Sequence, residues 1–153
     1  MNLTFDISLS NGYENKSQVA RVLTESWVEN NIFCPNCGNN LSSYENNKPV
    51  ADFYCSSCNE DYELKSKKSS MGKKIVDGAY STMIERLQSN QNPNLFFLNY
   101  DVKKFQVSNF IVIPKHFFVP DIIEKRKPLS PTAKRAGWIG CNILMQSIPI
   151  IIL

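Results

Sequence analysis

The stretch that decides the fold is Asp52-Phe-Tyr-Cys-Ser-Ser-Cys-Asn-Glu-Asp-Tyr-Glu-Leu-Lys65. Within it, a C-x-x-C pair stands between an aspartate and a Glu-x-Lys motif. A second C-x-x-C pair lies upstream, with seventeen residues between the two pairs. One short region therefore combines a metal-binding pattern with a trio of charged side chains that is typical of hydrolytic sites.

The cysteine pattern is C-x2-C-x17-C-x2-C, which falls within the spacing of zinc ribbons. Each C-x-x-C pair places two thiolates on one metal ion, and four thiolates form a closed site that is structural and not hydrolytic. The alternative is four unligated buried cysteines, or redox pairs. We predict a structural Zn²⁺ site, and we expect the fifth cysteine, Cys141, to be a buried apolar thiol. The predicted zinc ligands are Cys34, Cys37, Cys55 and Cys58.

The charged trio consists of Asp52, Glu63 and Lys65. Two carboxylates that converge on one point bind Mg²⁺ through oxygen, and such an ion polarises a phosphodiester and activates a bound water. In a strand, Lys65 points to the same side as Glu63, where it can orient the attacking water. A Glu-x-Lys pair alone is common by chance on solvent-facing strands. We therefore treat a catalytic site, with Asp52 and Glu63 as Mg²⁺ ligands, as a hypothesis that requires the three groups to converge.

The composition describes an ordinary globular chain. With 153 residues, of which 42% are hydrophobic and 20% charged, the chain is long enough for one domain with a core, and wholesale disorder is excluded. It contains no apolar run long enough for a transmembrane helix, and its N-terminus does not have the pattern of a secretory signal. We therefore expect a cytoplasmic protein, in which paired C-x-x-C motifs are more often metal ligands than disulfides.

The periodicity of the chain predicts a layered α/β or α+β fold. Residues 17–30 have helical spacing, with Ser17 as the expected N-cap. The segments 49–55 and 61–65 are expected to pair as a hairpin with the second cysteine pair near its turn. The remaining expectations are a helix over 77–88, central buried strands over 94–100 and 110–114, and a loop over 120–131.

Taken together, these features resemble the methyl-directed restriction endonucleases of the DpnI type, which cut adenine-methylated GATC. Five blocks carry the resemblance and cover most of residues 1–143 in order. They are RVLTESWV (21–28), CPNCGNN (34–40), NNKPVADFYCSSCNEDYELKSKK (46–68), DGAYSTM (77–83) and KPLSPTAKRAGWIGCNI (127–143).

The resemblance implies a PD-(D/E)XK nuclease core, a central mixed sheet flanked by helices with an inserted four-cysteine zinc site, over residues 1–143. It implies that Asp52 and Glu63 bind Mg²⁺ and that Lys65 serves the attacking water. Two departures stand out: Pro49 and Asp52 are separated by two residues, and the family's C-terminal winged-helix domain has no counterpart in this length. We expect residues 144–153 to form an apolar tail at a truncation point.

The resemblance further implies that the partner is double-stranded DNA methylated on adenine. We expect no membrane partner, and the sequence does not define the oligomeric state, for which we favour a monomer. Basic side chains supply the phosphate contacts of such proteins, and apolar ones contact methyl groups in the major groove. Trp138, which follows two cations in the loop from Ala133, is a candidate methyl reader, although it could equally pack at a core edge. The alternatives to an endonuclease are a non-cleaving, zinc-stabilised DNA-binding protein and a zinc-ribbon interaction domain. The expected DNA contacts are Lys67, Lys68, Lys134, Arg135 and Trp138.

Overall fold

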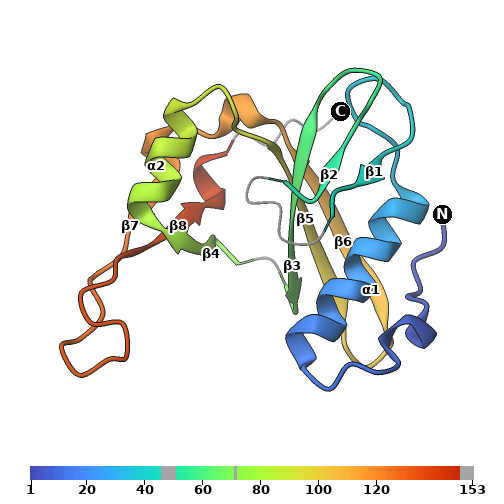
Figure 1. The fold of residues 1–153 in the computed structure, drawn as a ribbon, viewed down its shortest axis with the longest axis horizontal. Helices are drawn as coiled ribbons and strands as arrows, with labels where there is room; N and C mark the ends of the chain where they lie inside the picture. Colours follow the sequence, from blue (N-terminus) through green and yellow to red (C-terminus); the bar gives the residue numbers. More distant parts are fainter. Residues whose placement is uncertain (46–50, 71, 149–153) are drawn as a thin grey trace. The chain divides into compact units, whose positions relative to one another are not determined.

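The computed structural model describes residues 1–45, 51–70 and 72–148, which form an α+β fold (Figure 1). The chain divides into two compact units, residues 1–70 with 93–114 and residues 71–92 with 115–153. The first contains the 3-10 helix η1 (Ile7–Ser10), α1 (Lys16–Asn31), β1 (Ser42–Ser43), β2 (Phe53–Tyr54), β3 (Asp61–Lys68), β5 (Asn94–Asp101) and β6 (Gln106–Ile113). The second contains β4 (Lys74–Ala79), α2 (Tyr80–Gln88), η2 (Lys115–Phe117), η3 (Pro120–Ile122), β7 (Ile123–Lys125), β8 (Gly140–Leu144) and η4 (Met145–Ser147).

The first unit is built on a five-stranded mixed sheet with the order β1-β2-β3-β5-β6. Only β3 and β5 are parallel neighbours, and the other pairs are antiparallel. The prediction of a buried central strand is confirmed for β5, where residues 94–99 are all buried. It is wrong for the segment 110–114, because β6 is the edge strand and its side chains at 110–112 are only partly buried. Apolar runs do not by themselves distinguish these two positions.

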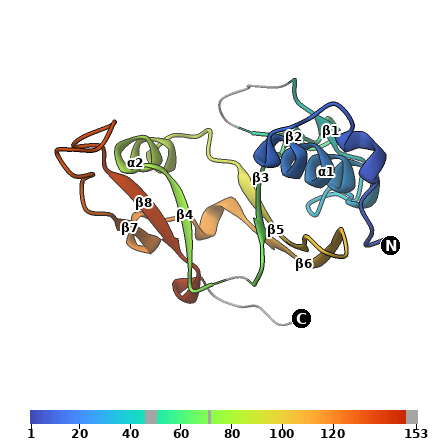
Figure 2. The same ribbon diagram turned by 90° about the horizontal axis from the view of Figure 1, so that it is seen from below.

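Helix α1 lies across one face of this sheet (Figures 1 and 2). The predicted helix is confirmed, but the N-cap is Asn15, whose side chain accepts a hydrogen bond from the Ser17 backbone N–H at 2.9 Å. The buried side of α1 packs on the strands, and the Trp27 indole donates to the Asn2 carbonyl at 2.7 Å. The buried core of this unit contains Leu23, Trp27, Val28, Phe53, Tyr62, Phe96 and Leu98, together with five further buried residues.

The predicted hairpin is present as β2 and β3, which pair antiparallel with Phe53 opposite Tyr62. The chain between these strands contains the second cysteine pair, so that pair lies at the hairpin turn. Side chains alternate along β3 as expected. Tyr62 is buried in the core, and Glu63 and Lys65 lie on the other face of the strand. Pro49 lies outside the described residues.

The second unit is a three-stranded antiparallel sheet, β4-β8-β7, with α2 against β4 and β8. The helix expected over 77–88 begins only at Tyr80, because Asp77 to Ala79 belong to β4 and pair with β8. The loop expected over 120–131 contains β7, which pairs with the same strand. Strand β8 includes Cys141, which is fully buried as predicted. Strand β8 ends at Leu144, one residue past the expected end of the nuclease domain at residue 143. Residues 149–153 of the expected apolar tail lie outside the described residues.

Candidate functional site

The two C-x-x-C segments fold into matching turns. The Gly38 N–H donates to the Cys34 carbonyl at 2.8 Å, and the Asn59 N–H donates to the Cys55 carbonyl at 2.9 Å. Both closing residues have a positive φ, 76° for Gly38 and 59° for Asn59. Glycine and asparagine adopt this left-handed conformation most readily, so each turn has a residue suited to close it. The repeated geometry aims the two thiols of each pair at one point.

The four cysteine sulfurs form a compact cluster, with all four Sγ atoms within 4.8 Å of one another. The Sγ atoms of Cys34 and Cys58 are 3.6 Å apart, and those of Cys37 and Cys55 are 3.4 Å apart. A disulfide requires about 2.05 Å, whereas Zn–S bonds of about 2.3 Å set tetrahedral S–S edges of about 3.8 Å. The cluster therefore fits a zinc ion and not a pair of disulfides.

Polar side chains contact the sulfurs of Cys37 and Cys34. The Asn39 side chain donates to Cys37 Sγ at 3.3 Å, and this bond together with the Asn39 backbone N–H lowers the pKa of Cys37 to about 6. On the buried side, the Tyr62 hydroxyl lies 3.1 Å from Cys34 Sγ. Burial, and then this contact, raise the pKa of Tyr62, so its proton stays in place to bond the sulfur. Such outer contacts orient metal ligands and tune their affinity.

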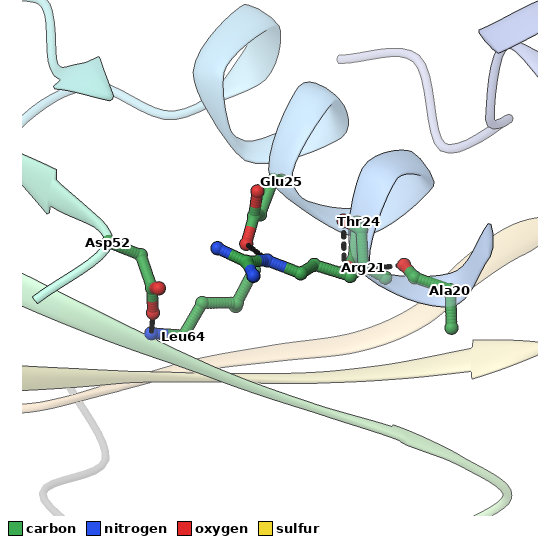
Figure 3. Close-up of polar contacts among 6 residues, drawn as sticks. All are labelled: Ala20, Arg21, Thr24, Glu25, Asp52 and Leu64. Carbon is green, nitrogen blue, oxygen red and sulfur yellow. Dashed lines mark hydrogen bonds and ion pairs between the residues drawn. The ribbon is translucent and has the colours of Figure 1, made fainter. Parts of the chain in front are cut away.

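Asp52 is fixed against the two neighbours of Glu63 in β3. Its backbone N–H donates to the Tyr62 carbonyl at 3.0 Å, and its Oδ2 accepts from the Leu64 N–H at 2.7 Å (Figure 3). These two bonds lie on either side of Glu63, so Asp52, which immediately precedes β2, is held next to the part of β3 that carries Glu63. The Glu63 charge accordingly raises the pKa of Asp52, after burial as the larger cause.

Lys65 completes the charged trio on the same strand. Its Nζ lies 2.8 Å from Glu63 Oε1, and both side chains are mostly buried, with 27% and 16% exposed. The Lys65 charge also lowers the pKa of Asp52, although burial dominates and the net pKa is raised. The structure thus places Lys65 against Glu63 and Asp52 against the two neighbours of Glu63. Carboxylate oxygens such as those of Asp52 and Glu63 are the ligands that a hard cation such as Mg²⁺ prefers.

Helix α1 adds two charged residues that the sequence reasoning did not include. Arg21 Nε lies 2.6 Å from Glu25 Oε1, and the Arg21 side chain reaches from the helix toward Asp52 (Figure 3). The Arg21 charge lowers the pKa of Asp52, while the Asp52 charge raises the pKa of Glu25, where burial is the main cause. In the sequence, the two residues have only the spacing of an ordinary helical ion pair, which carries no signal of a site.

The ionised form of Asp52 is destabilising in the metal-free protein, and this has a testable consequence. Its folded-state pKa is raised above the ordinary 3.8, so burial of the charge costs stability at neutral pH. We expect Asp52→Asn, which can still accept the Leu64 N–H, to stabilise the zinc-loaded, magnesium-free protein by about 1 kcal/mol at pH 7. The gain should shrink as the pH falls through the raised pKa and then below 3.8, where the wild-type carboxyl becomes neutral in both the folded and the unfolded state. Thermal unfolding at several pH values measures it, and a less stable variant at pH 7 would contradict the expectation.

The predicted methyl reader lies in a closed loop of the second unit. The Leu129 N–H donates to the Trp138 carbonyl at 2.9 Å and closes the loop. The Arg135 guanidinium lies 4.5 Å from the Trp138 ring centre, and the ring also packs on Gly140, where an added Cβ would come within 2.8 Å. Trp138 is partly buried, while Lys134 and Arg135 are exposed. The indole therefore has a packing role in this loop, and its role as a reader stays a prediction.

The chain matches a protein-family model over residues 1–151, that of DpnI, described as the Dam-replacing family. The class that this match defines is the restriction-type nucleases that act on methylated DNA. The match spans nearly the whole chain, so the chain belongs to the DpnI family, as its sequence blocks suggest. Among the described residues, no helix is long and apolar enough to cross a membrane.

Proposed function

We propose that this protein is a Mg²⁺-dependent endonuclease that cleaves double-stranded DNA at adenine-methylated GATC sites. The observation that carries the proposal is a pair of hydrogen bonds from Asp52 to Tyr62 and Leu64, the residues before and after Glu63. Lys65 is in turn ion-paired to Glu63. This arrangement supports a PD-(D/E)XK core, in which two carboxylates and a lysine on adjoining strands act on one phosphodiester. Membership of the DpnI family supports methylated DNA as the substrate class.

The roles of the residues follow from their chemistry. Asp52 and Glu63 would hold the Mg²⁺ ion, which polarises the scissile phosphate and lowers the pKa of a bound water. Lys65 would orient that water and neutralise charge that develops on the phosphate oxygens. As the water oxygen bonds to phosphorus, one P–O ester bond breaks and its oxygen leaves with a proton. The partly buried Glu63–Lys65 ion pair fixes the positions of these two side chains, so they would need little reorganisation when DNA binds.

Zinc would support this site from the hairpin turn. Cys55 and Cys58 lie in the connection between β2 and β3, the strands that position Asp52 and Glu63. A closed four-thiolate site has no open position for water, so zinc would act on the fold and not on the phosphodiester. The Tyr62 contact to Cys34 links the cluster directly to the residue that precedes Glu63.

Cleavage of plasmid DNA tests the proposal directly. Zinc-loaded protein is incubated with adenine-methylated or unmethylated plasmid, with Mg²⁺ present or omitted; omission is preferable to a chelator, which would also strip zinc. We expect fragments that end at GATC sites, from methylated plasmid and with Mg²⁺ only. Retention of intact methylated DNA by protein that holds zinc would instead establish a binding module without turnover. Failure to retain any DNA would favour an interaction domain.

The methyl-reading role of Trp138 is tested by comparing two substrates. We expect Trp138→Ala to weaken cleavage of methylated duplexes by about tenfold or more, since loss of a good base-edge contact costs about 1–3 kcal/mol. Residual binding to unmethylated DNA should change much less. The matched control is Arg135→Ala, which removes a cation from the same loop and should weaken binding to both duplexes with a smaller salt dependence. Equal loss on both substrates for Trp138→Ala would show that the indole is structural only.

The phosphate contacts are proposed for two lysines of the first unit and two cations of the second. Lys67 and Lys68 are exposed at the end of β3, just beyond the Glu-x-Lys motif. Lys134 and Arg135 are exposed in the loop closed by Trp138. Cations of this kind supply sequence-independent affinity for the DNA backbone, which falls as salt rises.

A further inference from the structure

The carboxylates around Asp52 are already balanced by two internal cations. Lys65 is paired with Glu63 at 2.8 Å, and Arg21 is paired with Glu25 at 2.6 Å. Lys65 contacts Glu63, whose two neighbours in β3 hold Asp52, and the Arg21 side chain reaches toward Asp52 (Figure 3), so both cations lie near the position where the proposed function places the metal ion. A divalent ion that binds at Asp52 must therefore enter a site in which positive charge is already present.

Arg21 is the cation that can change partner without dismantling a strand. It projects from α1 toward Asp52, and its side chain is 45% exposed, so solvent reaches it (Figure 3). The guanidinium has five N–H donors in a planar fork, which bonds a phosphate as well as it bonds a carboxylate. It also repels a nearby divalent ion, by an amount that grows as the surroundings become less polar.

We propose that Arg21 competes with the metal ion at Asp52 in the DNA-free protein and moves to a DNA phosphate when substrate binds. This inference rests on the proposed function, because it takes the Asp52–Glu63 metal site as given. The charges make the exchange favourable: three carboxylates and two cations leave one negative charge, a divalent ion makes it one positive charge, and one phosphodiester cancels that. DNA and metal therefore bind cooperatively, and the DNA-free protein holds metal weakly.

The contrary view is that Arg21 and Glu25 are an ordinary ion pair on a helix surface. Such i,i+4 pairs stabilise a helix slightly and have no effect on a distant ligand. The two views differ in what happens to metal affinity when Arg21 loses its charge. The ordinary pair predicts no change, whereas competition predicts tighter metal binding and weaker coupling to DNA.

The experiment measures Mn²⁺ binding from the signal of the free ion in electron paramagnetic resonance. Zinc-loaded wild-type protein is compared with Arg21→Gln, with and without an adenine-methylated GATC duplex that carries phosphorothioate linkages throughout the site to resist cleavage. The control is Lys16→Gln, which removes an equal charge from an exposed position at the start of the same helix. Zinc content and circular dichroism confirm that each variant is folded, and denaturing electrophoresis confirms that the duplex is intact during the measurement.

Without DNA, we expect Arg21→Gln to bind Mn²⁺ about tenfold more tightly than the wild type, and Lys16→Gln to match the wild type. With the duplex, wild-type affinity for Mn²⁺ should rise by about 5- to 150-fold, and this coupling should be at least several-fold smaller in Arg21→Gln. Unchanged Mn²⁺ affinity in Arg21→Gln, or undiminished coupling, would overturn the competition while leaving the nuclease proposal intact.

A second measurement needs no variant, because coupling between ligands is reciprocal. Fluorescence anisotropy of the methylated duplex on wild-type protein should show DNA affinity rising with Mn²⁺ by the same factor. A DNA affinity that is independent of Mn²⁺, in protein that binds both ligands, would also overturn the inference. Absence of any saturable Mn²⁺ binding, with or without DNA, is a different pattern: it would refute the Asp52–Glu63 metal site and the proposed function with it.

Discussion

Replacing Lys65 by alanine is expected to lower the cleavage rate constant by about 10²- to 10³-fold, the usual cost of removing one preorganised charge from a transition state. The ammonium lies 2.8 Å from Glu63 Oε1 and is mostly buried, so its position is fixed before substrate arrives. Zinc content should be unchanged, because the candidate zinc ligands are all cysteines. Single-turnover cleavage of a methylated duplex measures the effect.

Glu63→Ala should remove activity at least as completely, because it deletes a proposed metal ligand together with the partner of Lys65. The matched control for Lys65→Ala is Lys67→Ala. Lys67 lies two residues further along the same face of β3 but is exposed. A phosphate contact at Lys67 predicts weaker binding and a smaller salt dependence, with the chemical step nearly unchanged. If Lys65→Ala and Lys67→Ala reduced the rate equally, Lys65 would be one more phosphate contact and the catalytic assignment would be wrong.

The sequence alone predicts features whose determinants are close together in the chain. The cysteine spacing was sufficient for the metal cluster because each C-x-x-C turn folds on its own residues, from Cys34 to Gly38 and from Cys55 to Asn59. The hairpin follows for the same reason, since β2 and β3 are joined by one of those turns. The positions of Asp52 and Glu63 are then set by strand pairing over about ten residues.

Features that depend on distant pairing were not predicted. Asp77 to Ala79 have helical periodicity with the residues that follow them, yet they form a strand because β8, more than sixty residues away, supplies the hydrogen bonds. Likewise, nothing in the spacing of Arg21 and Glu25 indicates a site. Their approach to Asp52 arises only when α1 packs on the sheet, and it is this packing that brings the extra charges to the hairpin.

Removing zinc is expected to abolish cleavage by unfolding the hairpin, with an effect larger than that of any single catalytic substitution. Structural zinc sites contribute on the order of 10 kcal/mol of apparent binding free energy, which is comparable to the whole stability of a small domain. We expect Cys55→Ser, or a strong zinc chelator, to remove amide exchange protection from β2 and the start of β3. Magnesium omission should leave that protection in place and stop only the chemistry.

The chain offers a matched control for this prediction in its fifth cysteine. Cys141 is fully buried in β8, outside the cluster, and its Sγ contacts the Gly78 carbonyl at 3.5 Å. Cys141→Ala should therefore leave one zinc ion per chain and keep the hairpin protected, at the modest cost of a small cavity. Zinc measured by atomic emission and exchange measured by mass spectrometry separate the two variants. Activity that survived complete loss of zinc would show that β2 and β3 hold Asp52 beside Glu63 without metal, because the strand pairing and the Asp52–Leu64 bond would then be sufficient.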